Sequence, residues 1–205
     1  MKHEWRKKEK EYYIPKEKVQ LVKIPKFKFF TIQGKGNPNS KEFEEAIGVL
    51  YSLSYAVRIM PRNGITPKDY FEYTVYPLEG LWDLTEEGRK QETLNKDELI
   101  YTIMIRQPEF VTEEVYKLAM DIVKKKKPHV LLDKVKFQVI EDGLSVQMLH
   151  IGPYEDEERT FKEMKQFCSE NNLNLKTKVH REIYLSDFRK IESSKLKTVL
   201  RYIVE

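Results

Sequence analysis

The chain has 205 residues, of which 40% are hydrophobic, 12% aromatic and 34% charged, so it holds enough apolar material for a packed core and is not globally disordered. Its 37 Lys and Arg against 33 Asp and Glu give a net charge of +4 with both signs mixed throughout, which argues against a dedicated nucleic-acid-binding protein. No apolar run approaches the ~18 residues of a membrane-spanning helix. The only cysteine, Cys168, excludes an internal disulfide, and the lack of a hydrophobic leader after Met1 predicts a cytoplasmic protein.

The N-terminal segment, residues 1–18, is charged rather than hydrophobic. Between residues 2 and 18 it holds seven Lys or Arg and four Glu, and the interrupting acids favour a tethering segment over a nucleic-acid contact. A second basic run, Lys124–Lys127, follows a helical pattern. It is typical of a solvated helix end that interacts favourably with the helix dipole.

The first half of the chain predicts a strand, a helix and two further strands. Alternating Phe, Ile and Val over 19–34 predict a strand, and apolar residues at helical spacing predict an amphipathic helix over 40–58. Asn39 is the expected N-cap of this helix, with Glu42 returning the hydrogen bond. Two further strands are expected at 70–76 and 99–106, with a polar hairpin excursion between them at 85–97.

The second half predicts two helices and four strands. The first helix, over 111–127, begins after the N-cap Thr112. The turn signal Glu141-Asp142-Gly143 predicts a hairpin. Cys168 falls on the apolar stripe of the second helix, which favours a core residue over a nucleophile. The hairpin strands are expected at 137–140 and 144–151, and the second helix at 157–172. The last two strands are expected at 179–185 and 197–204.

The order of these elements repeats. A strand, a Gly turn, a helix and two strands occur over 28–106 and again over 144–205, and Gly34 precedes Phe43 by the same nine residues that separate Gly152 from Phe161. A sheet covered by a helix on one face only leaves its other face to be buried or used. The sequence therefore predicts an α+β fold of two β-α-β-β modules paired around a pseudo-two-fold axis, with a ligand groove between them.

The predicted domain organisation follows from this repeat. Residues 19–205 are expected to form one domain after the charged segment. Module one is expected at about 19–106, the connecting helix at about 111–127 and module two at about 137–205.

Several strings of the sequence resemble those of GyrI-like small-molecule-binding proteins. The resemblance covers the chain from about Tyr12 to the C-terminus. It departs at Phe188, where relatives often carry Pro. The matching strings are Ile32-Gln-Gly-Lys-Gly-Asn-Pro-Asn, Leu50-Tyr-Ser-Leu-Ser-Tyr-Ala-Val, Pro77-Leu-Glu-Gly-Leu-Trp, Leu149-His-Ile-Gly-Pro-Tyr-Glu-Asp, His180-Arg-Glu-Ile-Tyr-Leu-Ser-Asp and Lys195-Leu-Lys-Thr-Val-Leu-Arg.

This resemblance implies two paired β-α-β-β modules with a ligand groove, as in the drug-sensing domains of AraC-type and MerR-type regulators and in gyrase-inhibitory proteins. The chain has no length for a helix-turn-helix module before the first strand, so it resembles the stand-alone form. Some stand-alone relatives hydrolyse the strained cyclopropane of DNA-alkylating natural products. The resemblance therefore implies a similar detoxification activity for this chain.

Glu182 is the strongest candidate for a catalytic residue. Because side chains alternate along a strand, His180, Glu182 and Tyr184 share one face, and we expect the other face, with Arg181 and Ile183, to pack on the helix. A carboxylate among aromatic rings is partly desolvated, so it attracts a cation or takes a proton from water. The strand pattern alone also fits a surface Glu paired with a Lys, whereas the resemblance implies a Glu in the ligand cavity.

The remaining candidates are aromatic. The ligand-binding residues are expected to be Tyr51, Tyr55, Tyr76, Trp82 and Tyr184. For each a plain structural role stays open: an i,i+4 stack for Tyr51 with Tyr55, and a core position for Trp82. Tyr154 follows Gly-Pro at a helix entrance and is the expected second catalytic residue, as a hydroxyl donor, with a hydrophobic staple as the alternative.

No metal or cofactor is expected. The four histidines show no metal-ligand spacing, and there is no HExxH string. Gly-x-Ser-x-Gly, P-loop and Rossmann motifs are also missing from the sequence.

Three functions fit these residues. The first is an enzyme that binds a planar, apolar electrophile and hydrolyses its cyclopropane, with Glu182 as general base. The second is a non-catalytic drug-binding or sensing protein, in which Glu182 neutralises a cationic drug beside Trp82. The third, a gyrase-inhibitor-like module that binds a protein, is disfavoured by the slightly basic charge balance. The expected partner is a small molecule, without membrane or nucleic acid.

Overall fold

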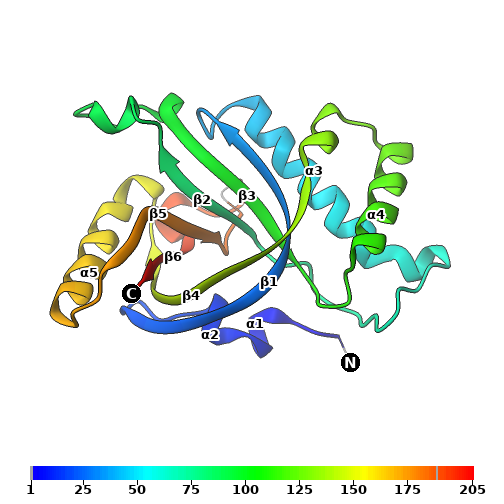
Figure 1. The fold of residues 1–205 in the computed structure, drawn as a ribbon, viewed down its shortest axis with the longest axis horizontal. Helices are drawn as coiled ribbons and strands as arrows, with labels where there is room; N and C mark the ends of the chain where they lie inside the picture. Colours follow the sequence, from blue (N-terminus) through cyan, green and yellow to red (C-terminus); the bar gives the residue numbers. More distant parts are fainter. Residues whose placement is uncertain (1, 188) are drawn as a thin grey trace. The chain divides into compact units, whose positions relative to one another are not determined.

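The computed structural model describes residues 2–187 and 189–205, so the departure at Phe188 lies outside the described residues. The fold is mixed α+β, as predicted. Its antiparallel strands form a closed barrel in the order β1-β3-β2-β5-β6-β4 (Figure 1). The strands are β1 (Gln20–Lys35), β2 (Leu78–Leu84), β3 (Leu99–Gln107), β4 (Lys136–Ile151), β5 (Leu175–Tyr184) and β6 (Lys197–Val204). The helices are α1 (Trp5–Lys8), α2 (Lys10–Tyr13), α3 (Lys41–Ile59), α4 (Glu113–Lys126) and α5 (Glu157–Glu170).

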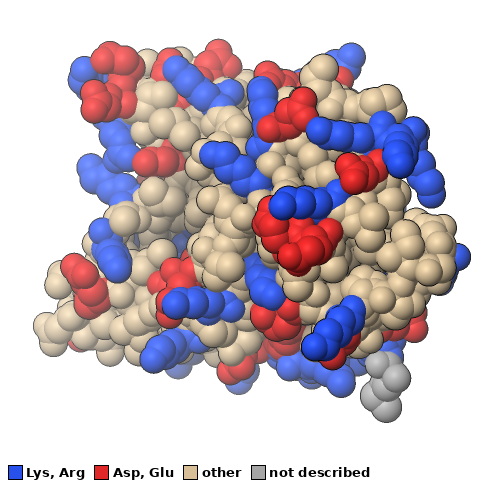
Figure 2. Space-filling model, turned by 45° about the vertical axis from the view of Figure 1, so that its right-hand side comes forward, with Lys and Arg blue, Asp and Glu red and all other residues tan. Residues whose placement is uncertain are grey.

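The chain divides into two compact units. The first is formed mainly by residues 27–78 and 84–140, and the second by residues 5–26, 79–83 and 141–205. None of the helices in the described part of the chain is both long and apolar enough to cross a membrane. On the face seen in Figure 2, Lys and Arg side chains lie among Asp and Glu side chains, as the mixed sequence leads one to expect.

In the first unit, β1 pairs with β3 and α3 packs against α4 and β3. The helix α3 is capped by Ser40, whose Oγ accepts the N–H of Phe43 at 3.3 Å. The prediction of Asn39 as N-cap is therefore wrong by one residue, because Asn39 donates its own N–H to Asn37 Oδ1 at 3.0 Å. The prediction that Thr112 caps α4 is confirmed, since its hydroxyl accepts the N–H of Val115.

The predicted strand over 70–76 is wrong. Only Tyr73 of this segment forms a bridge, with His3, and the strand of this region is β2, which begins at Leu78. The segment instead forms an aromatic cluster: the rings of Tyr70 and Tyr73 lie 5.1 and 5.9 Å from that of Phe110. The aromatic residues of this segment thus pack on Phe110 and do not form a β-ladder.

The predicted hairpin around Glu141-Asp142-Gly143 is also wrong, because β4 runs without a break through these residues. Gly143 adopts a positive φ of 69°, which only glycine takes readily, but the chain stays extended. The side chain of Asp142 is not on a turn. It is buried, and its Oδ2 and Oδ1 accept hydrogen bonds from Arg181 Nε and Nη2 at 2.8 and 2.6 Å.

In the second unit, α5 packs on β4 and β6. Cys168 and Met164 of the helix contact a cluster that includes Val146, Leu200 and Tyr202, so the prediction that Cys168 is a core residue is confirmed. Figure 1 shows α5 alongside β5 as well.

A buried ionic network links the strands of this unit. Arg181 donates to both Asp142 and Glu79, and Arg201 lies 3.4 Å from Asp142. Burial by itself raises the pKa of Asp142, but Arg181 and then Arg201 outweigh it and hold that pKa below its usual range.

The N-terminal segment is part of this network and not only a tether. Tyr13 is buried, and its hydroxyl donates to Glu79 Oε1 at 3.3 Å. Arg201 Nη2 donates to the carbonyl of Tyr12 at 2.7 Å, and Gln147 Nε2 donates to that of Glu11. Because these donors are buried, the segment supplies acceptors that they need.

A candidate ligand site around Glu182

The candidate site is built on β5, where Glu182 pairs with Gly80 of β2 and with Leu200 of β6. The predicted alternation of side chains is present, but the expectation for the two faces is wrong. The helix α5 lies over the face of Glu182, since its Phe161 ring is 4.7 Å from that of His180. The other face carries Arg181, which is held in the ionic network instead of packing on the helix.

Two side chains hold the Glu182 carboxylate, and a third, Trp82, supports one of them. Its Oε2 accepts a hydrogen bond from the Tyr184 hydroxyl at 2.8 Å, and its Oε1 lies 2.9 Å from His180 Nε2. The Tyr184 hydroxyl in turn accepts a hydrogen bond from Trp82 Nε1 at 2.8 Å. The side chain of Glu182 is 12% exposed, so this oriented carboxylate is largely shielded from solvent.

Trp82 occupies the space above Gly80. A Cβ added to Gly80 would lie 2.6 Å from Trp82 Nε1 and 3.3 Å from the Tyr184 hydroxyl. Any side chain at this position would therefore displace the indole. The glycine two residues before Trp82 allows the indole to reach Tyr184.

Tyr154 is the exposed tyrosine of the cluster. Its ring lies edge-on to that of Tyr184 at 6.0 Å and it is 36% exposed, whereas the Tyr184 hydroxyl is already engaged. Burial first, and then the charge of Glu182, raise the pKa of Tyr154 to about 12. The same two causes raise the pKa of Tyr184 well above its usual value. Both phenols are therefore protonated donors at neutral pH.

The turn that carries Tyr154 is fixed by His150, a residue that sequence analysis did not single out. Its Nδ1 lies 2.9 Å from Thr160 Oγ1 on α5, and its Nε2 lies 3.1 Å from the carbonyl of Pro153. Gly152 allows the sharp turn with a φ of 135°. The lone histidine in a strand gave no signal of this role.

Glu157, in the first turn of α5, is a second carboxyl group of the cluster that sequence analysis missed. The residue is 6% exposed, and its Oε1 has no hydrogen-bond partner among the described residues. Burial, then Glu182 and Glu155, raise the pKa of Glu157 to about 10. An acid in the first turn of a helix ordinarily indicates a solvated group that favours the helix dipole, so the sequence gave no warning of its burial.

The structure brings Trp82, Tyr154, Glu182 and Tyr184 together within the second unit. The other three predicted ligand-binding residues belong to the first unit. There the Tyr51 and Tyr55 rings lie 6.3 Å apart on α3, with Tyr55 45% exposed. Tyr76 is buried and is not in a strand; its hydroxyl lies 3.5 Å from His3 Nε2, and the Arg106 guanidinium lies 4.6 Å from its ring. The convergence of these three residues with Glu182 stays a prediction.

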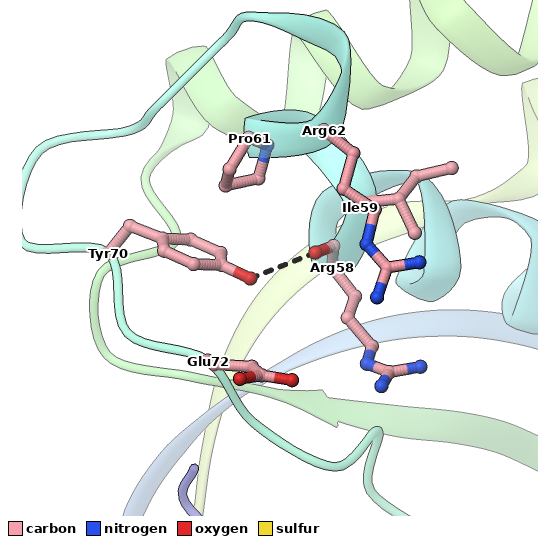
Figure 3. A pocket seen from close by; sticks show the side chains of 6 residues that line it. All are labelled: Arg58, Ile59, Pro61, Arg62, Tyr70 and Glu72. Atoms are coloured by element: carbon pink, nitrogen blue, oxygen red, sulfur yellow. Dashed lines mark hydrogen bonds between the residues drawn. The ribbon is translucent and has the colours of Figure 1, made fainter. Parts of the chain in front are cut away.

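A separate cavity of about 250 Å³ lies in the first unit, and none of the predicted site residues lines it (Figure 3). Figure 3 shows Tyr70 closing one side, with its hydroxyl donating to the Arg58 carbonyl at 2.9 Å. Its lining residues are Arg58, Ile59, Pro61, Arg62, Tyr70 and Glu72.

The groups around Glu182 suit acid–base chemistry on an aromatic ligand. A fixed carboxylate can accept a proton, and the Tyr154 hydroxyl can donate a hydrogen bond. Trp82 is only 5% exposed, which fits the core position that the sequence left open for it, and its contact with a ligand stays a prediction. Within the described residues, His, Cys, Asp and Glu form no cluster of three or more that could hold a metal ion.

Comparison with known proteins agrees with a ligand-binding site. The family model of the GyrI-like small molecule binding domain matches residues 17–203. A hydrolase from Listeria innocua is 35% identical with a TM-score of 0.90, over 99% of this chain and 100% of that chain. A further hydrolase from that organism is 36% identical with a TM-score of 0.92, over 100% of both chains. No curated protein matches the chain.

A third Listeria innocua structure, an uncharacterized conserved protein, is 37% identical with a TM-score of 0.92, over 99% of this chain and 100% of that chain. The resemblance of the sequence strings is thus confirmed by both the family model and the fold. Because the match extends over nearly the whole chain, this protein belongs to the GyrI-like small-molecule-binding family.

Proposed function

We propose that this protein binds planar, hydrophobic or cationic small molecules beside Glu182 and hydrolyses those that carry a strained cyclopropane, as a cytoplasmic detoxification activity. The observation that carries the proposal is the Glu182 carboxylate, oriented by Tyr184 and His180 beside Trp82. The similarity to two Listeria innocua hydrolases supports hydrolysis over simple binding.

In the proposed reaction, Glu182 acts as general base. It takes a proton from a water molecule as the water oxygen bonds to a cyclopropane carbon, and the strained carbon–carbon bond breaks. The released electron pair moves into a conjugated carbonyl of the ligand, whose oxygen then takes up a proton. Ring strain lowers the intrinsic barrier, so a single positioned base and one donor are sufficient.

Tyr154 is the proposed donor to that carbonyl. Tyr154 is 36% exposed, whereas the Tyr184 hydroxyl is held between Trp82 and Glu182. The raised pKa of Tyr154, about 12, keeps the hydroxyl protonated as charge develops on the ligand oxygen. Tyr184 and His180 orient the base instead of touching the reacting atoms.

Two parts of the proposal rest on the sequence alone. Tyr51, Tyr55 and Tyr76 are proposed as further ligand contacts, and alanine variants that leave affinity unchanged would exclude them. The two β-α-β-β modules are proposed to be related by a pseudo-two-fold axis. Superposition of residues 28–106 on residues 144–205 tests this relationship.

Incubation with a panel of cyclopropane-bearing alkylators and planar cationic drugs tests the function. Mass analysis of the recovered compound should show a product heavier by one water. A compound that is retained by the protein but keeps its mass would instead favour the non-catalytic drug-binding or sensing alternative. No observation on the described residues favours the gyrase-inhibitor-like alternative.

A further inference from the structure

Glu157 is a buried carboxyl group that the proposed reaction does not use. Its Oε1 is buried without a hydrogen-bond partner among the described residues, in a residue that is 6% exposed. Glu182 differs, because each of its oxygens already has a partner, in His180 and Tyr184. A buried acceptor that lacks a partner is rare, so Glu157 is the acceptor in this cluster with capacity left for a ligand.

The surroundings of Glu157 hold two acids and one guanidinium, which is directed to a backbone carbonyl. The acid groups that act on it are Glu182 on β5 and Glu155 on the preceding turn, and both repel a second negative charge. The Arg159 guanidinium, on the same helix, is directed to the carbonyl of Ile151 at 2.8 Å. The other titratable groups of the cluster are Tyr154 on the same turn, Tyr184 on β5, His150 on β4 and Asp156.

We propose that Glu157 is a second carboxyl that responds to the charge of the ligand: it keeps its proton when a neutral ligand binds and releases it to solvent when an aromatic monocation binds. The site then presents one negative charge to neutral ligands and two to cations. This inference rests on the proposed ligand binding beside Glu182 but not on the proposed hydrolysis.

The direction of the effect follows from electrostatics. With a pKa of about 10 in the free protein, Glu157 is protonated at neutral pH. A positive charge within about 4–6 Å lowers the pKa of a carboxyl group by about 1–3 units. The affinity for a cation therefore increases with pH, by up to about tenfold per pH unit, between the pKa of the bound state and that of the free state. A neutral ligand brings no such charge, so its affinity does not change in this range.

Calorimetric titration with ethidium, a planar monocation, tests the inference. At pH 8.5, heats measured in two buffers of different ionisation enthalpy give the number of protons released. We expect the wild-type protein to release a substantial fraction of one proton with ethidium and none with acridone, a neutral planar compound. The dissociation constant for ethidium should fall as pH rises from about 7 to 10.

Two variants assign the proton. Glu157→Gln cannot ionise, so it should bind ethidium without proton release and without pH dependence in this range. Glu163→Gln, which changes an exposed acid of α5 that is not among the groups acting on Glu157, should release protons as the wild type does. Infrared spectra of the wild-type protein give a second measurement that does not depend on the folding of a variant. The carbonyl band of a protonated carboxylic acid should weaken when ethidium binds.

Three results would overturn the inference: ethidium binding without proton release, equal release by Glu157→Gln, or no binding of ethidium at any pH. The absence of hydrolysis would affect only the proposed function. Conversely, hydrolysis of a neutral substrate without ethidium-linked proton release would leave the proposed function intact and exclude this role of Glu157.

Discussion

Trp82 donates its indole N–H to the hydroxyl of Tyr184 at 2.8 Å, and that hydroxyl donates to the Glu182 carboxylate over the same distance. The three side chains come from two paired strands, in which Gly80 lies opposite Glu182. Trp82 is therefore the first donor in a series of hydrogen bonds that ends at the carboxylate, and its ring is proposed as a ligand contact.

Glu182→Gln should abolish turnover and leave the binding of a neutral planar ligand nearly intact. The isosteric amide keeps the apolar surroundings, which supply most of the binding at roughly 25 cal/mol per Å² of apolar area buried. It cannot accept a proton from water, and general-base assistance is typically worth about 10²–10⁴ in rate. A time course of product formation measures this loss.

Glu163→Gln is the matched control for that variant, because it removes the same charge from an exposed position on α5. Its rate should equal that of the wild-type protein. If the Glu182→Gln variant keeps its rate, the base lies elsewhere, although the family assignment would be unaffected.

Trp82→Ala should weaken ligand binding before it affects the chemical step. Loss of a large aromatic contact in a binding site costs about 2 kcal/mol, or about 30-fold in affinity. Trp82→Phe keeps a ring but removes the donor to Tyr184, so its effect on affinity should be smaller. Calorimetric titration measures the affinities of the wild type and both variants, because it does not depend on the Trp82 fluorophore that the variants lack. Equal affinities for all three proteins would exclude Trp82 from the ligand site.

Gly80→Ala should destabilise the protein and disturb the site together. The added Cβ would lie 2.6 Å from Trp82 Nε1, so the indole has to move and its bond to Tyr184 is lost. Overpacking of this kind typically costs about 1–3 kcal/mol. Gly48→Ala on α3 is the control, since its Cβ meets nothing within 4 Å and alanine favours a helix. Urea unfolding should show opposite changes in stability for the two variants.

Asp142→Asn should destabilise the protein at neutral pH by about 3–5 kcal/mol, because it leaves Arg181 and Arg201 with too little buried negative charge. The pKa of Asp142 is lower in the folded protein than its usual value, so its contribution to stability is present above an unfolded pKa of about 3.9. It is lost as the pH falls through the folded pKa. The difference between wild type and variant in urea unfolding should therefore shrink below about pH 4. A constant difference down to pH 2 would contradict this assignment.

Local signals in the sequence predicted those features whose physical cause is local. The alternation of His180, Glu182 and Tyr184 follows from strand geometry, and the Thr112 cap follows from a hydroxyl placed before an apolar stripe. Which face of β5 meets α5 depends on a contact between distant segments, through Phe161, and the prediction for it was wrong.

Two further errors have the same origin, whereas the Asn39 cap was misplaced by one residue within its own turn. The Glu141-Asp142-Gly143 signal is typical of a turn, but Arg181 and Arg201 pair with Asp142 and the strand continues. Glu157 has the sequence context of a solvated helix start, and only the fold places it against Glu182. Residues whose role is set by partners far along the chain therefore escaped prediction, whether structural or functional.

The contacts of residues 11–13 bear on where this domain begins as a folding unit. The family match starts at residue 17, yet Arg201 and Gln147 donate to the carbonyls of Tyr12 and Glu11. A polypeptide trimmed to the family boundary would keep every β-strand but lose the backbone carbonyls that accept hydrogen bonds from Arg201 and Gln147. The thermodynamic domain is thus longer than the one that homology delimits, and expression of the shorter form should yield insoluble or loosely folded material.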